Sequence, residues 1–207
     1  MYEEFEGTKP VSGRMKVDLG ALAAYMREHV PGFAGELQIE QFKGGQSNPT
    51  FRLTAGDQRY VLRTKPAPAA KLLPSAHAID REFRVMDALS KAGFPAARMY
   101  ALCEDESVIG RAFYLMEFIE GRVFWDQSLP GMTPAERGAI YDEMNRVISM
   151  LHKLDYQAIG LGDYGKPGNY FARQIDRWSK QYKAAETEHI PAMEHLIEWL
   201  PQHIPAG

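Results

Sequence analysis

The sequence contains a single cysteine, Cys103, and no long hydrophobic run. One cysteine excludes an intrachain disulfide and a metal site built from several cysteines. No apolar stretch approaches the roughly 20 residues that cross a bilayer. The N-terminus, MYEEFEGTKP, is acidic and polar, unlike a secretory signal. We therefore expect a cytoplasmic protein.

The sequence also lacks an excess of charge of either sign. It has 24 lysines and arginines against 27 aspartates and glutamates, which gives a net charge of −3. This balance provides no basis for attraction to nucleic acid or to a membrane surface, so neither is expected as a partner. Among the six histidines only His189 and His195 approach metal-ligand spacing, and no metal site is predicted in the chain.

Short strand patterns fill the part of the sequence before Gly121. Hydrophobic residues make up 45% of the chain. Residues 1–17 show no periodicity and are expected to be a flexible lead-in, and Asp18 can cap a short helix. Gly56-Asp57 is a turn signal between two strands. The predicted elements are strands over 37–42, 50–54 and 58–64, a helix over 76–92, and strands over 99–103 and 111–118.

Helical patterns replace the strands after Gly121. The segment Thr133-Pro134-Ala135-Glu136 is a capping box with proline at the first helical position, and it predicts a long helix to about Leu154. Further helices are predicted over 170–185 and 190–202. Strands grouped before helices indicate an α+β protein in two lobes. The predicted divisions are an N-terminal extension over 1–34, a first lobe over 35–120 and a partial helical lobe over 121–207, with a boundary near Glu120–Trp125.

A glycine turn joins the first two predicted strands. Backbone amides at such a turn can approach a phosphate without obstruction from side chains, and nearby polar side chains add donors. Ordinary hairpin chemistry explains the same residue types. A Walker A loop is excluded, because no Gly-Lys-Ser/Thr follows. The candidate phosphate-binding residues are Gly44, Gly45, Gln46, Ser47, Asn48 and Thr50.

Charged residues follow the turn at kinase-like positions. Arg63 and Lys65 share one face of the third predicted strand, where a kinase places the cation for its nucleotide phosphates. A solvated edge is the alternative. Glu82 lies on the core side of the next predicted helix, where a carboxylate needs a cationic partner, and Arg63 or Lys65 is the candidate. The alternative is a surface glutamate paired with Arg84 or Lys91.

The order of these features is more specific than any one of them. A glycine turn, a basic strand, a helix glutamate, a polar connector after an apolar strand, and then helices resemble the protein-kinase-like fold. Particular segments resemble the aminoglycoside phosphotransferase and choline kinase group, and most of all the kinase-like domains of the fused acyl-CoA dehydrogenase family members. The resemblance covers about residues 35–204 and is carried by GQSNPTF, YVLRTKP, LLPSAHAIDREFRVMDAL, VIGRAFYLMEFIEGRVF and LPGMTPAERGAIYDEMNRVISMLHKLD.

The resemblance implies a fold and a role for each candidate residue. The fold is a first lobe of five antiparallel strands and one helix, followed by the first helices of a helical lobe. Gly44–Thr50 would cover the phosphates, and Glu82 would be the helix glutamate of the ion pair. Met116 would flank an adenine whose edge binds the Glu117 carbonyl and the Ile119 amide. Arg63 replaces the usual lysine, with Lys65 as the reserve candidate.

The resemblance also implies an ATP-dependent phosphotransferase that uses Mg and acts on a small-molecule hydroxyl. The acceptor is open: an aminoglycoside and a hydroxyacyl thioester are both suggested by the group. The family's His-Gly-Asp catalytic loop is absent from this sequence. We therefore expect a fragment that holds the nucleotide site, contains no catalytic residue and is inactive alone. The alternatives are a non-catalytic kinase-like binding or regulatory module and a plain α+β scaffold.

The last predicted helices carry apolar faces that would normally be covered. In this sequence they have no later segment to pack against, and large exposed apolar patches favour association. Dimerisation of the fragment is therefore a further expectation. The residues concerned are Trp178, Tyr182, Leu196, Trp199 and Leu200.

Overall fold

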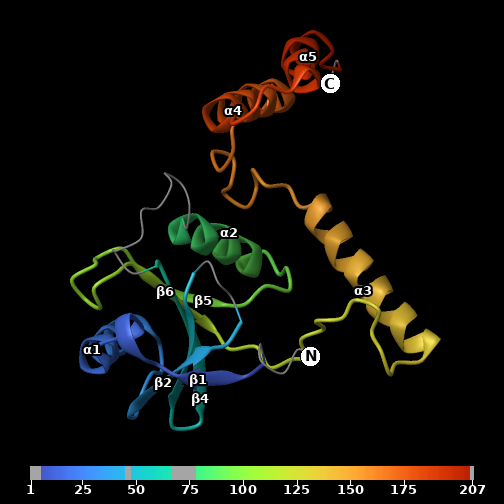
Figure 1. Cartoon of the computed structure of the whole chain (residues 1–207). Coiled ribbons are helices and arrows are strands. Elements are labelled where there is room, and N and C mark those ends of the chain that lie inside the picture. The colour runs from blue at the N-terminus through green and yellow to red at the C-terminus, as the bar shows by residue number, and fades with distance from the viewer. Residues whose placement is uncertain (1–5, 45–47, 67–77, 206–207) are drawn as a thin grey trace. The chain divides into compact units, whose positions relative to one another are not determined.

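The structure of the chain is a computed structural model that describes residues 6–44, 48–66 and 78–205. It divides into two compact units, Met1–Gly160 and Leu161–Gly207. The first unit contains a β-sheet with helices, and the second contains a helical hairpin (Figure 1). The predicted α+β class is confirmed. The predicted lobe boundary near Glu120–Trp125 lies inside the first unit and stays a prediction.

A six-stranded antiparallel sheet forms the centre of the first unit. Its strands lie in the order β1-β2-β3-β4-β6-β5. All five predicted strands are present, and β1 is an additional edge strand within the lead-in that was expected to be flexible. β1 escapes a pattern-based prediction because it has only three residues, and its Pro10 is tolerated at a sheet edge. The strands are β1 (Thr8–Pro10), β2 (Leu37–Phe42), β3 (Thr50–Ala55), β4 (Gln58–Thr64), β5 (Met99–Cys103) and β6 (Phe113–Glu117).

The register of the sheet is set by its tight turns. Gly56 has a φ of 58° at the first central position of the two-residue connection between β3 and β4, a conformation that favours glycine. The resulting register aligns cross-strand neighbours in rows. The turn-side row, beside the glycine turn, contains Thr50, Arg63 and Tyr114. The connector-side row, nearer to the segment 118–125 that follows β6, contains Glu40, Arg52, Val61 and Met116.

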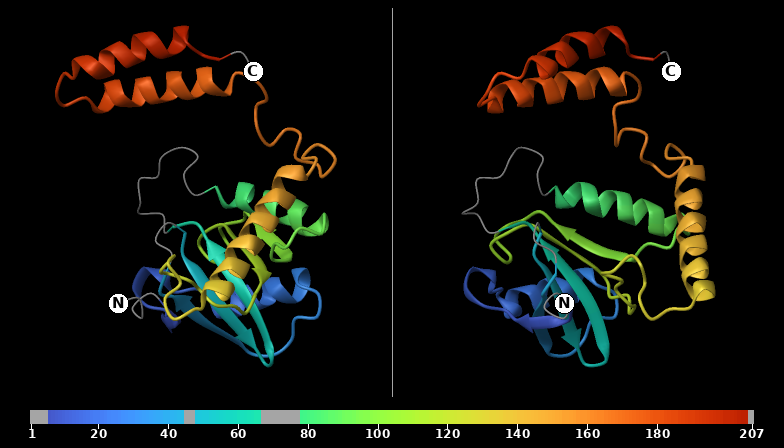
Figure 2. Two further views of the ribbon diagram at one scale, coloured as in Figure 1. Left: turned by 90° about the vertical axis from the view of Figure 1, so that its right-hand side faces the viewer. Right: turned by 45° about the vertical axis from the view of Figure 1, so that its right-hand side comes forward.

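Helices cover the two faces of this sheet (Figures 1 and 2). α1 (Leu19–His29) begins at the predicted cap, where the Asp18 carboxylate accepts a hydrogen bond from the Ala21 amide at 3.0 Å. Its buried side chains join a core with Phe51 and other sheet residues. α2 (Ile79–Lys91) packs through a separate cluster that includes Tyr114. Because strand side chains alternate, Thr50 and Arg52 face the side opposite to Phe51, which is the α2 side.

The remaining helices match the sequence-based expectations closely. α3 (Pro134–Lys153) starts at the predicted capping box, in which Thr133 and Glu136 bond each other's backbone amides. In the second unit, α4 (Tyr170–Ala185) and α5 (Pro191–Trp199) form a hairpin, followed by the short 3-10 turn η3 (Leu200–Gln202). A second 3-10 turn, η2 (Gly13–Met15), precedes α1. Among the described residues no helix is both long and apolar enough to cross a membrane.

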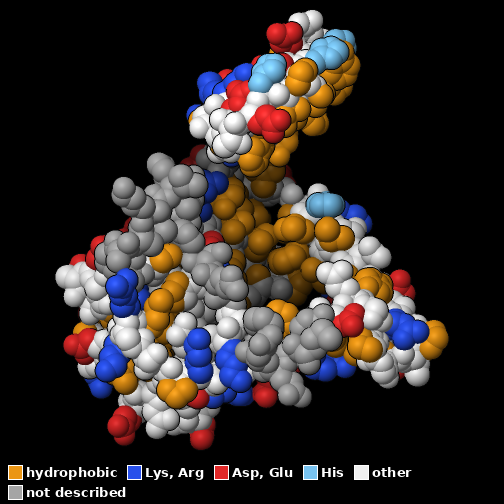
Figure 3. All heavy atoms as spheres, viewed as in Figure 1, with side chains coloured by type: hydrophobic (Ala, Val, Ile, Leu, Met, Phe, Trp, Pro, Cys, Tyr) orange, Lys and Arg blue, Asp and Glu red, His pale blue; other side chains and the backbone are white. Residues whose placement is uncertain are grey.

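The helices α3 to α5 expose apolar side chains. Figure 3 shows hydrophobic side chains gathered on these helices. On α3, Met144 is 59% exposed, and on the hairpin Trp178 is 61% exposed. Leu196, Trp199 and Leu200 are also exposed. The exposure agrees with the apolar faces expected from the sequence except at Tyr182, which is half-buried on the hairpin. The dimer inferred from these faces stays a prediction.

Candidate functional site

A cavity of about 820 Å³ opens on the side of the sheet that carries Thr50, Arg52 and Arg63. Its volume lies in the range of small-molecule sites, roughly 300–1,000 Å³. The wall combines sheet residues with the connector that follows β6, residues 118–125. The polar lining residues are Glu6, Thr8, Thr50, Arg52, Arg63 and Arg122, and the aromatic ones are Phe42, Phe118, Phe124 and Trp125. Gly44, where the glycine turn begins, also lines the cavity.

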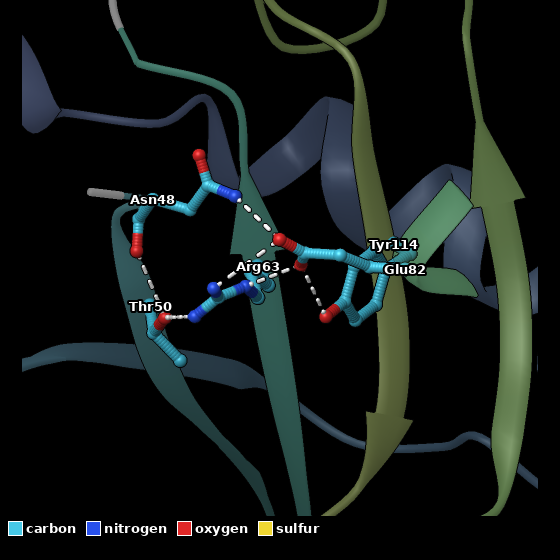
Figure 4. A network of polar contacts seen from close by, with 5 residues as sticks. All are labelled: Asn48, Thr50, Arg63, Glu82 and Tyr114. Atoms are coloured by element: carbon cyan, nitrogen blue, oxygen red, sulfur yellow. Dashed lines mark hydrogen bonds and ion pairs between the residues drawn. The ribbon is translucent and has the colours of Figure 1, made fainter. Parts of the chain in front are cut away.

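An ion pair between Arg63 and Glu82 is the centre of the polar wall (Figure 4). The Arg63 Nε donates to Glu82 Oε2 at 2.8 Å, and Nη2 lies 3.5 Å from Oε1. The Arg63 Nη1 donates to the Thr50 hydroxyl at 3.0 Å. The pairing predicted for Glu82 is therefore present, and its partner is Arg63.

Two further side chains hold the Glu82 carboxylate in place. The buried Asn48 amide donates to Oε1 at 2.9 Å, and the buried Tyr114 hydroxyl donates to Oε2 at 3.1 Å. Burial, and then the neighbouring Glu82 carboxylate, raises the pKa of Tyr114 above its ordinary range, so its hydroxyl stays a donor. Glu82 thus accepts hydrogen bonds from three residues that lie on β4, on β6 and just before β3 (Figure 4). Such a network fixes the position of the arginine that it pairs with.

The geometry leaves part of Arg63 available. A guanidinium has five N–H donors, and Arg63 uses one each on Nε, Nη1 and Nη2 within the described residues. One N–H on each terminal nitrogen therefore remains. Because Arg63 also lines the cavity, these donors suit an anionic group bound there.

Only some of the other predicted phosphate-binding residues lie at the cavity in the structure. Gly44 and Thr50 line the cavity, and Asn48 is engaged with Glu82. Gly45, Gln46 and Ser47 lie outside the described residues. Lys65 follows the end of β4, where its amide donates to the Ala112 carbonyl at 3.0 Å, and it is not among the cavity-lining residues. Of the two candidate cations, Arg63 is the one that faces the cavity.

The predicted base-binding residues lie at the start of the connector. Met116 is half-buried in the connector-side row of the sheet. The Glu117 amide donates to the Arg98 carbonyl at 2.8 Å, and its side chain accepts from the Arg98 amide at 3.1 Å. Ile119 is 59% exposed, and in the part of the chain that the structure describes no backbone partner is recorded for its amide. The roles proposed for these residues stay predictions.

Sequence reasoning missed several residues of the wall. Phe42 and Phe118 stack with centroids 6.4 Å apart and an angle of 9° between the rings, although one precedes the glycine turn and the other follows β6. Arg52 lines the cavity and pairs with Glu40, whose other oxygen accepts from the Thr8 hydroxyl at 3.0 Å. The antiparallel pairing of the predicted strands could have placed Arg52 on the face of Arg63.

The Arg52–Glu40 pair predicts a pH dependence. The hydrogen bond from Arg52, and secondly that from Thr8, holds the pKa of Glu40 below its ordinary value of 4.5. A lowered folded-state pKa gives stability that is present above the unfolded-state value and is lost as the pH falls through the folded-state value. Because the pair is partly exposed, we expect Glu40→Gln to cost about 0.5–1 kcal/mol at pH 7. The cost should shrink toward zero near pH 3, as measured by urea unfolding at both values. An equal cost at both pH values would contradict this assignment.

Two other features of the described chain lack the chemistry of an anion site. A groove of about 670 Å³ along α3 is lined by apolar side chains apart from Glu143. On the α4–α5 hairpin, Glu186, His189 and Glu194 bring potential ligand atoms within 4.8 Å of one another. Lys183 forms ion pairs with both of these glutamates and so offsets part of their negative charge.

Comparison with known proteins gives consistent results. A family model described as "Phosphotransferase enzyme family" matches residues 38–207. Acyl-CoA dehydrogenase family member 10 of Mus musculus is 49% identical over 199 residues, which cover 96% of this chain and 18% of that protein. Acyl-CoA dehydrogenase family member 11 of Homo sapiens is 47% identical over 194 residues, covering 92% of this chain and 25% of that protein. The chain thus spans a quarter or less of these two relatives.

A solved structure is similar over most of the chain. It is described as a "putative aminoglycoside phosphotransferase" from Ralstonia eutropha and is 68% identical, with a TM-score of 0.78. The match covers 92% of this chain and 54% of that one. The chain therefore spans about half the length of the solved relative.

Proposed function

The chain belongs to the phosphotransferase enzyme family, and from this membership we propose that its 207 residues bind the nucleotide of a small-molecule kinase. One observation carries the proposal: Arg63, fixed by Glu82, has unused donors on the wall of a cavity that begins at the glycine turn. An arginine held in this way binds phosphate oxygens without reorganising.

The lining residues suit a nucleoside triphosphate such as ATP. Arg63 and Thr50 would bind its phosphates together with the backbone amide of Gly44, where the glycine turn begins. The base would lie toward the connector, near Met116, with the Glu117 carbonyl and the Ile119 amide at its edge. Because the guanidinium is a planar fork rather than a point charge, Arg63 can bind a phosphate and Glu82 at the same time.

Near this cavity, the described residues offer magnesium no comparable donor set. Magnesium prefers oxygen ligands from carboxylates, substrate phosphates and water. Near the cavity, Glu40 and Glu82 are both paired with arginines, which leaves Glu6 as the lining carboxylate without an ion pair in the described chain. Carboxylates that hold magnesium and orient an acceptor hydroxyl are nevertheless required for phosphoryl transfer. We therefore assign nucleotide binding to these residues and no step of the transfer.

For a protein in which such carboxylates complete the site, the proposed reaction is transfer of a phosphoryl group from ATP to a small-molecule hydroxyl. The acceptor remains open between two classes. The description of the solved relative names an aminoglycoside, and the names of the curated relatives refer to acyl-CoA chemistry. Neither class is favoured by the residues that line this cavity.

Thermal unfolding in the presence of ATP tests nucleotide binding by the 207-residue chain. A ligand that binds only the folded state must stabilise it, by about 2.7 kcal/mol at one hundred times its dissociation constant. For a chain of this size we expect the midpoint to rise by roughly 5–10 °C. The same titration on Arg63→Met should give a much smaller shift. A midpoint that does not move at millimolar ATP, with or without magnesium, would exclude the proposal.

A non-catalytic binding module is the second candidate. It is favoured by the pairing of Glu40 and Glu82 with arginines, which leaves neither carboxylate free to hold a metal ion. The two candidates differ in turnover. A longer protein containing these residues that binds ATP but transfers no γ-phosphate to any tested hydroxyl compound or to water would support the module, whereas measurable transfer would support the kinase.

A further inference from the structure

Arg52 is a second arginine on the cavity wall, separate from the Arg63 network. It is held from one side: its Nη2 donates to Glu40 Oε2 and lies 3.4 Å from the Thr8 hydroxyl. Thr8 also donates to the other oxygen of Glu40. Two neighbouring strands, β1 and β2, therefore fix a guanidinium that projects from β3.

The ion pair does not account for the position of this arginine. The side chains of Arg52 and Glu40 are 33% and 43% exposed, and an ion pair of that kind contributes little to stability. The Arg52 Nε is buried without a hydrogen-bond partner in the described structure, which is an unfavourable arrangement. Both facts suggest that Arg52 is placed for something other than folding, and it faces the cavity.

The register of the sheet shows which part of the cavity Arg52 faces. Thr50 and Arg63 lie in the turn-side row, where the phosphates are proposed to bind. Arg52 lies in the connector-side row, across from Val61, and Val61 lies across from Met116. Arg52 therefore lies two residues further along β3 than Thr50, in the same row as Met116, which is proposed to flank the base. The aromatic pair of Phe42 and Phe118 also lines this cavity.

We propose that Arg52 contacts the nucleobase, with its planar guanidinium stacked on the face of the purine. This inference rests on the proposed nucleotide-binding function. Arginine planes stack on bases because the weakly hydrated cation is attracted to the π-face of the ring. Glu40 and Thr8 are positioning residues that hold the plane. Because Thr8 lies on β1, the proposal makes β1 part of the nucleotide site. β1 precedes the segment that the family model matches, residues 38–207.

Two partial ligands separate the roles of Arg52 and Arg63. Adenosine carries the base and ribose without phosphates, and inorganic tripolyphosphate carries the phosphates without a base. We expect Arg52→Met to weaken adenosine binding to the 207-residue chain roughly tenfold and to change tripolyphosphate binding less than twofold. Arg63→Met should do the reverse. Isothermal titration calorimetry measures both ligands on both variants.

Three additional variants test the geometry. Arg146→Met removes an arginine that is paired with Glu143 on α3, away from the cavity lining, and should leave both affinities unchanged. Arg52→Lys keeps the charge but loses the plane, so it should restore less than half of the lost adenosine affinity. Thr8→Val should weaken adenosine binding about threefold, because the guanidinium loses part of its support.

The possible outcomes distinguish this inference from the proposed function. If the wild-type chain binds tripolyphosphate and adenosine but Arg52→Met leaves adenosine binding unchanged, the inference is wrong and the proposed function stands. Equal losses for both ligands would also overturn it, since Arg52 would then act as a general charge. If the wild-type chain binds neither partial ligand nor ATP, both fall together. Urea unfolding of each variant shows whether a loss of binding reflects a loss of folding.

Discussion

Replacing Arg63 with methionine is expected to weaken ATP binding roughly 10- to 100-fold, since a hydrogen bond to a charged group contributes about 1.5–3 kcal/mol. The loss arises because Arg63 provides the unused N–H donors of the turn-side row. Folding should survive the change. Glu82 keeps hydrogen bonds from Asn48 and Tyr114, so the carboxylate is not left without partners. Calorimetric titration with ATP, together with urea unfolding, measures both quantities.

Two companion variants make the Arg63 result specific. Arg63→Lys keeps the cation, but it has no planar fork with which to bind Glu82, Thr50 and a phosphate together, so we expect an intermediate loss of about threefold to tenfold. Arg146→Met removes an exposed arginine from α3 and should leave ATP affinity unchanged. The assignment fails if Arg63→Met binds ATP as tightly as the wild type. It also fails if Arg146→Met weakens binding to the same degree.

The Arg63–Glu82 pair shows how much of the candidate site can be predicted from residue patterns alone. Alternation along a strand put Arg63 and Lys65 on one face, and helical periodicity put Glu82 on the core side of α2. Those patterns narrowed the partner of Glu82 to two cations. The choice between them depends on where β4 ends: Arg63 lies within the strand, whereas Lys65 lies beyond Thr64. The sequence pattern predicts that strand end correctly, but alternation alone does not show which of two residues on one face reaches Glu82, because that contact depends on how α2 packs against the sheet.

The residues that sequence analysis missed depend on contacts between distant segments. Tyr114 reaches Glu82 because β6 lies next to β4, an order that skips β5. Phe42, the last residue of β2, stacks on Phe118, which follows β6, so this pair joins two segments that are far apart in the sequence. β1 is a strand only because β2 offers it an edge, since three residues carry no periodicity of their own. In each case the missing information was strand order, whereas the strands over 37–42, 58–64 and 99–103 were predicted within their observed bounds.

Alternate side chains of β3 point to opposite faces of the sheet, so one set packs in the core and the other lines the cavity. Phe51 and Leu53 are fully buried in the core beneath α1, while Thr50 and Arg52 line the cavity on the other side. A one-residue slip of register would move Phe51 and Leu53 to the cavity face and turn Thr50 and Arg52 toward the core, which would disrupt both the core and the site. The two-residue turn at Gly56 prevents such a slip, because its geometry fixes which residues of β3 and β4 face each other. Site and core therefore depend on the same register.

Replacing Leu22 with alanine is expected to lower the free energy of unfolding by about 2–5 kcal/mol, the usual cost of truncating a buried leucine. Leu22 is completely buried on α1, in a core cluster with Phe51, Leu62 and Phe113. α1 precedes the segment that the family model matches, residues 38–207, yet its buried side chains share a core cluster with residues of β2 to β6. Since domains of this kind are stable by about 5–15 kcal/mol in total, the loss is a large fraction of the whole. Urea unfolding followed by circular dichroism measures it.

Leu151→Ala provides the matched control for Leu22→Ala, because the same atoms are removed from a side chain that is 42% exposed on α3. We expect this variant to stay within about 0.5 kcal/mol of the wild type. ATP affinity of the folded Leu22→Ala chain should change less than twofold, since Leu22 packs on the face opposite to Arg63. Similar costs for the two leucines would mean that α1 is not part of the core. A large loss of ATP affinity in Leu22→Ala alone would instead show that the two faces of the sheet are energetically coupled through its register.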